Sequence, residues 1–167
     1  MTVDLQEARA LHDEVVAVDL HADTPKLMHT FGYDLGKRHK THRFGGRYFG
    51  HVDVTRMREG GLGAQIFGLW TFPVPRRGAA RSVHKQLDAL WAAVDKYPDA
   101  LARAPRVSDI AAARRRGQIG VLAGIEGGQA LEGELARVDE FARPGVGYIG
   151  LLPISATELG YPAQGLG

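Results

Sequence analysis

The chain has 167 residues, 44% of them hydrophobic and 24% charged, a composition typical of one globular domain rather than of a disordered segment. It contains no cysteine, which excludes disulfides and thiolate sites, so any metal must be held by histidine, aspartate or glutamate. The net charge of only +2 argues against a nucleic-acid partner. No apolar run reaches the roughly 18 residues of a membrane-spanning helix, so we expect no membrane partner. The start of the chain lacks the pattern of a signal peptide, so we expect a cytoplasmic protein.

The first predicted elements lead to a polar strand end. Apolar residues at helical spacing predict an amphipathic helix from after Thr2 to about His12. The apolar, valine-rich segment 15–21 predicts a strand, which ends at His21-Ala22-Asp23. A polar, glycine-rich loop is expected over about 30–50.

A short helix and a second strand are expected next. Asp53 is the expected N-cap of a helix near 53–59. Gly60-Gly61 indicates a turn, and 61–70 has the apolar character of a buried strand. Its last residue, Trp70, either packs in the core or lines the mouth of a pocket.

The second half of the chain repeats the order of helix and strand. Apolar residues at helical spacing predict a helix over 80–97. Ser108 is the expected N-cap of a helix that ends near Arg116, with Gly117 as its C-terminal cap. A buried strand is expected over 119–125.

One more helix and one more strand complete the predicted elements. The apolar stripe of this helix consists of Leu131, Leu135, Val138 and Ala142. Pro144-Gly145 ends the helix, and the nearly continuous apolar segment 146–153 predicts a fourth strand.

The alternation of helices with strands that are apolar on both faces predicts an α/β fold with a parallel sheet. Right-handed crossovers would curl four such units into an arc. A closed (β/α)8 barrel typically needs about 250 residues. We therefore expect residues 1–167 to form one N-terminal portion of a TIM-type barrel, about four parallel βα units.

Three polar residues are expected at the carboxyl ends of these strands, where such folds place their sites. His21 and Asp23 are two residues apart at an extended strand end, so an imidazole and a carboxylate can converge on a divalent metal. Alone, this spacing also arises from ordinary turn chemistry. Glu126, in Gly124-Ile125-Glu126-Gly127-Gly128, either binds a cation or is a turn carboxylate held by backbone N–H groups.

Four segments together resemble the membrane dipeptidase (renal dipeptidase-like) family of metallopeptidases. They are VDLHADTP (18–25), HVDVTRMREGGLGAQIF (51–67), GIEGG (124–128) and VGYIGLLPISATELGYPAQG (146–165). The resemblance lies in their order and spacing and covers nearly the whole chain. It implies a (β/α)8 hydrolase with two zinc ions that cleaves dipeptides.

The resemblance also implies roles for individual residues. His21 and Asp23 would bind the first zinc, and Glu126 would bridge both. Two histidines and an acid/base carboxylate would come from later strands that these 167 residues do not include. The paired zincs would activate a water for attack on the peptide carbonyl.

Three positions depart from the family pattern. Pro153 stands where the family typically has a histidine that contacts the substrate, and proline can neither bind a metal nor donate a hydrogen bond. Gly147 stands where an arginine is common, and Gln129 where a histidine is often found. These departures, with the later strands missing, predict that the isolated chain is inactive.

Two function classes therefore remain open. One is a zinc dipeptidase chain, and the other is a non-catalytic half-barrel that pairs with itself or with a second chain through its sheet edges. Four further histidines, which are His29, His39, His42 and His51, are expected to be exposed in the polar loop rather than to bind a metal.

Overall fold

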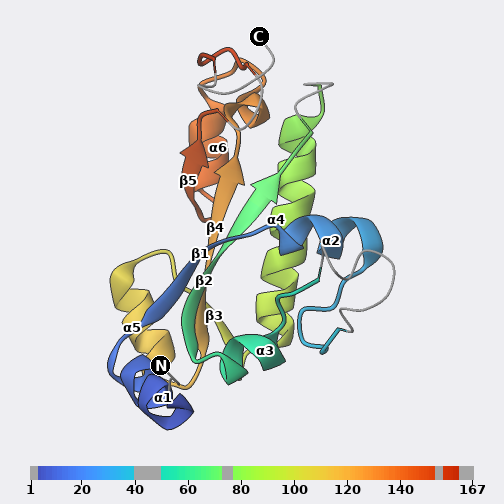
Figure 1. The fold of residues 1–167 in the computed structure, drawn as a ribbon. Coiled ribbons are helices and arrows are strands. Elements are labelled where there is room, and N and C mark those ends of the chain that lie inside the picture. Colours follow the sequence, from blue (N-terminus) through green and yellow to red (C-terminus); the bar gives the residue numbers. More distant parts are fainter. Residues whose placement is uncertain (1–3, 40–49, 73–76, 153–155, 162–167) are drawn as a thin grey trace.

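A computed structural model describes residues 4–39, 50–72, 77–152 and 156–161. Five parallel strands form its sheet: β1 (Ala17–Ala22), β2 (Leu62–Trp70), β3 (Leu101–Arg103), β4 (Ile119–Glu126) and β5 (Val146–Gly150). The helices are α1 (Leu5–Glu14), α2 (Thr24–Phe31), α3 (Val54–Glu59), α4 (Ala79–Lys96), α5 (Val107–Arg115) and α6 (Arg137–Ala142), with a 3-10 turn, η1 (Gly128–Leu131). The predicted α/β class with a parallel sheet is confirmed (Figure 1).

β4 lies in the interior of the sheet. It pairs with β2 along one edge, from Ala64↔Gly120 to Trp70↔Glu126. Its other edge is shared, because β3 pairs with the beginning of β4 and β5 with its end. β1 pairs only with β2 and forms an outer edge. The strands therefore run in the order β1, β2, β4, with β3 and β5 both beside β4.

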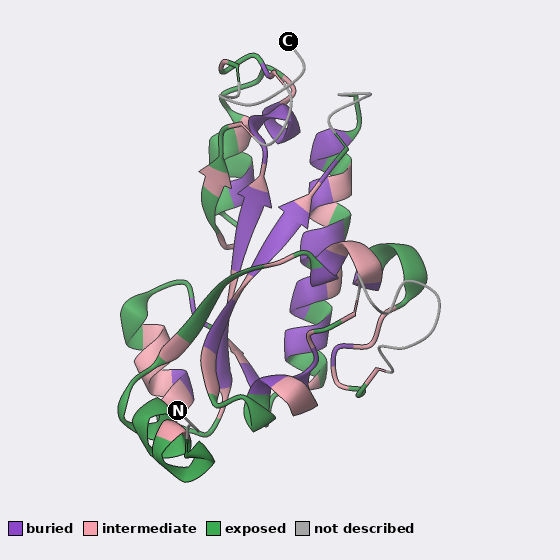
Figure 2. Ribbon diagram, in the orientation of Figure 1, coloured by how far each residue is buried: buried purple, intermediate pink, exposed green. Residues whose placement is uncertain are grey.

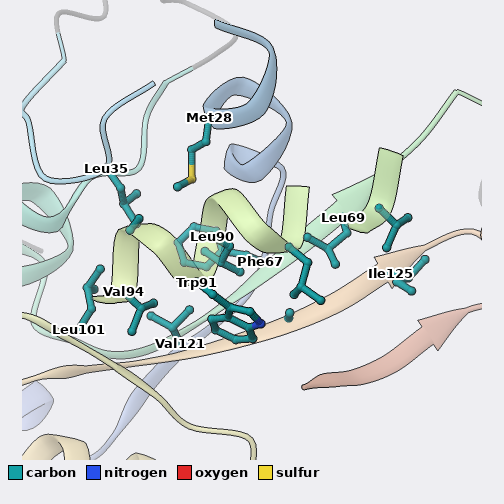
Figure 3. Close-up of a cluster of buried hydrophobic side chains, with 14 of the residues drawn as sticks. Met28, Leu35, Phe67, Leu69, Leu90, Trp91, Val94, Leu101, Val121 and Ile125 are labelled. Atoms are coloured by element: carbon teal, nitrogen blue, oxygen red, sulfur yellow. The ribbon is translucent and has the colours of Figure 1, made fainter. Parts of the chain in front are cut away.

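The hydrophobic core lies between the sheet and α4 (Figure 3). Leu87, Leu90 and Val94 recur at helical spacing, so they lie on one face of α4, and all three are buried. They meet alternate residues of the strands, such as Phe67 of β2 and Val121 of β4, because side chains one residue apart point to opposite faces of a sheet. Each such side chain contributes about 1.5–3 kcal/mol on burial.

The edge strands are much more exposed than the central ones (Figure 2). Most residues of β2 and β4 are buried, whereas β1 and β5 have none that is buried. Leu20 of β1 is 67% exposed although it is apolar. The apolar strands are therefore buried at the centre of the sheet, and the two edge strands are left uncovered.

The short helix before β2 is confirmed together with its cap. The Asp53 carboxylate accepts a hydrogen bond from the Arg56 backbone N–H at 2.9 Å, and it forms an ion pair with the Arg56 side chain at 2.7 Å. Asp53 is fully buried, so its partners are required.

Three predicted details are wrong. The helix near 108–116 begins at Val107 with Arg106 as its N-cap, because the Asp109 carboxylate accepts the Arg106 backbone N–H at 3.0 Å, which leaves Ser108 inside the first turn. The predicted helical stripe from 131 to 142 is interrupted by left-handed backbone at Glu132, so Leu135 is 74% exposed. The strand predicted over 146–153 ends at Gly150.

Two elements were not expected from the sequence. α2 follows directly on the first strand, and β3 is a strand of three residues. The Arg114–Arg116 run lies at the end of α5 as expected, and Gly117 has the left-handed φ of +70° expected of a C-terminal cap.

Candidate metal centre

The first two candidate ligands lie where β1 ends and α2 begins. His21 is near the end of β1, and Asp23 occupies the N-cap position of α2. An N-cap aspartate normally accepts a backbone N–H of its own helix, yet the Asp23 carboxylate makes no such bond. Its Oδ1 instead lies 3.2 Å from Nε2 of His21. The carboxylate is therefore directed to the imidazole and not to the helix.

The third candidate ligand is brought to the same point by the register of the sheet. Glu126 is the last residue of β4, and its Oε2 lies 3.3 Å from Nε2 of His21. One ligand atom from each of His21, Asp23 and Glu126 can be chosen such that all lie within 4.8 Å of one another. The expected convergence of the three side chains is present, although β2 separates their two strands.

Gly68 of β2 provides the space in which the three side chains meet. A Cβ at this position would lie 2.7 Å from Cε1 of His21 and 2.8 Å from Oδ1 of Asp23, closer than side-chain atoms can approach. Only glycine leaves the intervening strand flat enough for ligands from β1 and β4 to approach each other. The sequence signal for this role was a glycine inside a buried strand.

The electrostatics of the three residues favour a cation. Burial, and secondly the neighbouring Asp23 carboxylate, raise the pKa of Glu126. Oε2 of Glu126 is buried and accepts no hydrogen bond from the described residues, because its contact with His21 lacks suitable geometry. Two adjacent carboxylates and an imidazole are the donor set of a divalent metal site. A metal ion would supply the positive charge that Oε2 otherwise lacks, so the residues fit one.

Gln129 supports the backbone that carries Glu126. It is buried in η1, and its Nε2 donates to the carbonyl oxygen of Thr71 at 3.3 Å, to Oγ1 of Thr71 at 3.2 Å and to the carbonyl oxygen of Glu126 at 3.4 Å. Gln86 of α4 donates to the carbonyl oxygen of Trp70 at 2.8 Å. The Gln129 amide therefore links the ends of β2 and β4, and the Gln86 amide fixes the end of β2 to α4. Sequence analysis identified Gln129 only as a departure from a family pattern.

A cavity of about 460 Å³ opens beside Asp23, one of the three candidate ligands. It is lined by Asp23 itself, by Lys26 and Leu27 of α2, by the backbone segment at His51 and by Trp70. Trp70 is half-buried and its backbone is the register partner of Glu126. Of the two alternatives for Trp70, the structure favours the pocket mouth.

Among the described residues, His29, His39 and His51 do not belong to the metal-binding group. His29 is exposed on α2, as expected, and His51 is exposed while lining the cavity. His39 is half-buried, stacked on Tyr33 with ring centroids 3.7 Å apart, so its expected exposure is wrong. His42 lies outside the described residues.

Two of the family departures can be placed and one cannot. Gly147 is exposed in β5, and Gln129 has the supporting role given above. Pro153 lies outside the described residues. Tyr148 of β5 covers Gly124, where a Cβ would lie 2.1 Å from its ring, and burial, with Glu126 and Asp23 nearby, raises its pKa.

The structure is a parallel α/β sheet with a histidine and two carboxylates gathered at the carboxyl ends of its strands, the end where α/β barrels place their sites. The sequence matches the family described as Membrane dipeptidase (Peptidase family M19) over residues 5–163, so the chain belongs to that family. The resemblance seen in the sequence is thereby confirmed.

Individual relatives are longer than this chain. It is 29% identical to an uncharacterized dipeptidase of Schizosaccharomyces pombe, over 90% of this chain and 41% of that protein. The probable dipeptidase PvdM of Pseudomonas aeruginosa has the same fold, with a TM-score of 0.80 at 18% identity, over 96% of this chain and 40% of that one. A metallo peptidase of Rhodobacter sphaeroides, liganded with a phosphinate mimic of the dipeptide L-Ala-D-Ala, gives a TM-score of 0.64 at 16% identity, over 84% of this chain and 46% of that one.

The chain thus spans about two fifths of the length of the relatives it matches. This agrees with the predicted partial barrel, since the parallel sheet of this chain superimposes on only a part of each longer structure. None of the described helices is long and apolar enough to cross a membrane.

Proposed function

We propose that this chain supplies the zinc-binding part of a metal-dependent dipeptidase, with His21, Asp23 and Glu126 as the zinc ligands. The observation that carries the proposal is the convergence of these three side chains, with the buried Oε2 of Glu126 accepting no hydrogen bond from the described residues. Membership of the membrane dipeptidase family supports peptide-bond hydrolysis as the reaction.

The candidate ligands and the residues around them have separate roles in the proposed zinc site. When bound, zinc acts as a Lewis acid and lowers the pKa of a coordinated water. His21 in its neutral form donates Nε2, and the Asp19 carboxylate holds the His21 backbone N–H at 2.8 Å, which fixes the strand end that carries the imidazole. Asp23 and Glu126 supply the negative charge, and Gly68 keeps the approach to them open.

A polypeptide of these 167 residues should hold one zinc and not two. His21, Asp23 and Glu126 form the one metal-binding group found among the described residues. Three protein ligands can hold one zinc with an open position, but they leave a second ion without ligands of its own. The two-zinc chemistry that the family resemblance implies is then incomplete, so we propose that this polypeptide alone hydrolyses dipeptides near the background rate.

Zinc titration tests the metal proposal. Calorimetry at neutral pH should give at most one zinc per chain, and His21→Ala or Glu126→Gln should weaken binding at least tenfold, since each removes one of three ligands. His84→Ala is the matched control, because His84 also pairs with a glutamate, Glu140, but on the far side of α4. Two tightly bound zincs per chain, or equal losses in the control, would contradict the ligand assignment.

A second assay tests the reaction. The zinc-loaded polypeptide is incubated with L-L and L-D dipeptides, with Glu126→Gln as the control for contaminating peptidase. We expect no turnover above that control, because losing a single preorganised contact typically costs about 10²–10³ in kcat and more than one is missing. Turnover of a few per second that disappears in Glu126→Gln would refute the inactivity.

A second proposal concerns association, and the exposed edge strands favour it. β1 pairs on one side only, and its apolar residues Val18 and Leu20 are exposed. Unpaired edges and exposed apolar side chains are usually covered by another chain. We propose that β1 pairs with a second copy or with a complementary chain. A stable monomer in light scattering that binds no hydrophobic dye would count against this.

A further inference from the structure

The cavity beside Asp23 is lined by a cationic side chain, Lys26, that has no role in the proposed zinc chemistry. Lys26 lies one helical turn after Asp23 on α2, and both residues line the same cavity of about 460 Å³. Nζ of Lys26 lies 5.9 Å from the centre of the Trp70 ring, at the outer limit of a cation–π contact. Among the described residues, Lys26 has no ion pair with a carboxylate.

The charge of the cavity depends on the metal. With zinc bound, the two carboxylates of Asp23 and Glu126 neutralise the ion, and His21 contributes no charge. Lys26 is then left as an uncompensated positive charge in a half-enclosed space. Such a charge attracts an anion, and it does so more strongly than at an open surface because the walls at Leu27 and Trp70 exclude part of the solvent.

The size of the cavity also limits the ligand. A volume of about 460 Å³ lies in the usual range of small-molecule sites, which is roughly 300–1,000 Å³. A dipeptide is about 7 Å long in extended form, so it can reach from the ligands to a side chain one helical turn away. The ring of Trp70 offers an apolar surface for the body of such a molecule.

We propose that Lys26 binds a carboxylate of the substrate. The inference rests on the proposed function, because it assumes a dipeptide in the cavity. The carboxylate is either the C-terminal one, which every dipeptide carries, or that of an acidic side chain. Lys26 positions the substrate and takes no part in the bond cleavage, and it determines specificity only if the carboxylate is that of a side chain.

Four probes separate the two sources of the carboxylate. L-Ala-L-Ala is compared with its C-terminal amide, and L-Ala-L-Glu with L-Ala-L-Gln. Binding to the zinc-loaded chain is followed in ¹H–¹⁵N spectra through the indole N–H signals. The Trp70 signal reports binding because Trp70 lines the cavity. The Trp91 signal is the internal control, because Trp91 is buried and donates its indole N–H to the carbonyl oxygen of Pro144 at 2.8 Å. The signals of each probe in the same sample report whether it is hydrolysed.

Lys26→Met should weaken binding of the relevant carboxylate probe about tenfold, which is the loss of one charge-assisted contact of about 1.4 kcal/mol. Lys26→Arg should keep the affinity within about threefold, and Lys85→Met, on the exposed face of α4, should leave it unchanged. A loss for L-Ala-L-Ala, L-Ala-L-Glu and L-Ala-L-Gln, but not for the C-terminal amide, identifies the C-terminal carboxylate. A loss for L-Ala-L-Glu alone identifies the side-chain carboxylate.

The two proposals fail in different ways. If zinc binds but Lys26→Met leaves all four affinities unchanged, the carboxylate role is overturned and the zinc proposal stands. If calorimetry detects no zinc while Lys26→Met still weakens a carboxylate probe, the zinc proposal fails and the role of Lys26 stands. Equal losses for all four probes, the C-terminal amide included, would also overturn the inference, because the contact would then not depend on a carboxylate.

Discussion

Replacing Gly68 with alanine tests whether the flat centre of β2 is what allows the candidate ligands to meet. The added Cβ would lie 2.7 Å from Cε1 of His21 and 2.8 Å from Oδ1 of Asp23. Ordinary van der Waals contact needs 3.4–4 Å, so the imidazole and the carboxylate must each withdraw. Their displacement, of about 0.6 Å or more, exceeds the roughly 0.2 Å tolerance of a metal–ligand distance.

The expected loss follows from this mismatch. Disturbing the groups that orient metal ligands typically costs 10–100-fold in metal affinity, which is about 1.4–2.8 kcal/mol. The substitution also crowds a packed strand, so we expect about 1–3 kcal/mol of lost stability. Zinc affinity is measured by calorimetry, and stability by urea unfolding followed by circular dichroism.

Gly63→Ala, in the same strand, is the matched control. A Cβ at this position would lie 2.7 Å from Cγ1 of Val16, so the crowding is similar but involves no candidate ligand. Gly63→Ala should therefore lose stability and keep its zinc affinity. The reasoning is refuted if Gly68→Ala binds zinc as tightly as the unchanged chain, or if both variants lose affinity equally.

Two further predictions concern stability away from the ligands. The hydrogen bond from Tyr97, followed by that from Lys96, lowers the pKa of Asp34 from 3.8 to about 2. The Asp34 carboxylate therefore stabilises the fold fully above about pH 4, and this stabilisation is lost as the pH falls toward 2. Tyr97→Phe should therefore move the acid-unfolding midpoint, measured by circular dichroism, to higher pH, and an unchanged midpoint would contradict this. Asp53→Ala should lower the free energy of unfolding, measured in urea, by about 3 kcal/mol or more, because it removes a helix cap and leaves the Arg56 guanidinium without its buried partner. Asp109→Ala is the control: it removes an exposed capping contact, so it should cost under about 1 kcal/mol.

The long elements could be predicted from the sequence because each has a regular apolar pattern. α4 repeats apolar residues at helical spacing over five turns, and β4 carries no charged side chain before Glu126 at its end. β3 could not be predicted, because three residues are too few to establish a pattern and the strand exists through its pairing with Ile119–Val121. Pairing with a strand distant in the sequence, and not a local pattern, stabilises β3.

The second helical stripe was misread for a local reason. Leu131, Leu135 and Val138 do fall at helical spacing, but Glu132 and Gly133 both adopt positive φ, of 52° and 79°, which ends one turn and starts another. A glutamate in left-handed conformation has no sequence signature. Its carboxylate accepts the Gly78 backbone N–H at 2.6 Å, a contact across 54 residues that periodicity does not reveal.

The candidate ligands could be predicted from their positions at strand ends, but their surroundings could not. Polar residues at the carboxyl ends of neighbouring parallel strands converge wherever the register permits, so His21, Asp23 and Glu126 were identifiable. The role of Gly68 depends on the strand that lies between them, and the cavity at Lys26 depends on α2 folding back over Trp70. Both follow from contacts between distant segments.

β4 has a neighbouring strand on each side, and this affects how firmly the three candidate ligands are held. Amide protons of β4 are bonded into a sheet with a neighbour on each side, so they exchange with solvent only through large openings of the domain. Those of β1, which has one neighbour, exchange through local fraying. We therefore expect slow amide exchange on the strand that carries Glu126 and faster exchange on the strand that carries His21. A shared ion would tie the two together and slow the exchange of β1 most, which makes the amides of Val18 and Leu20 sensitive reporters of its arrival.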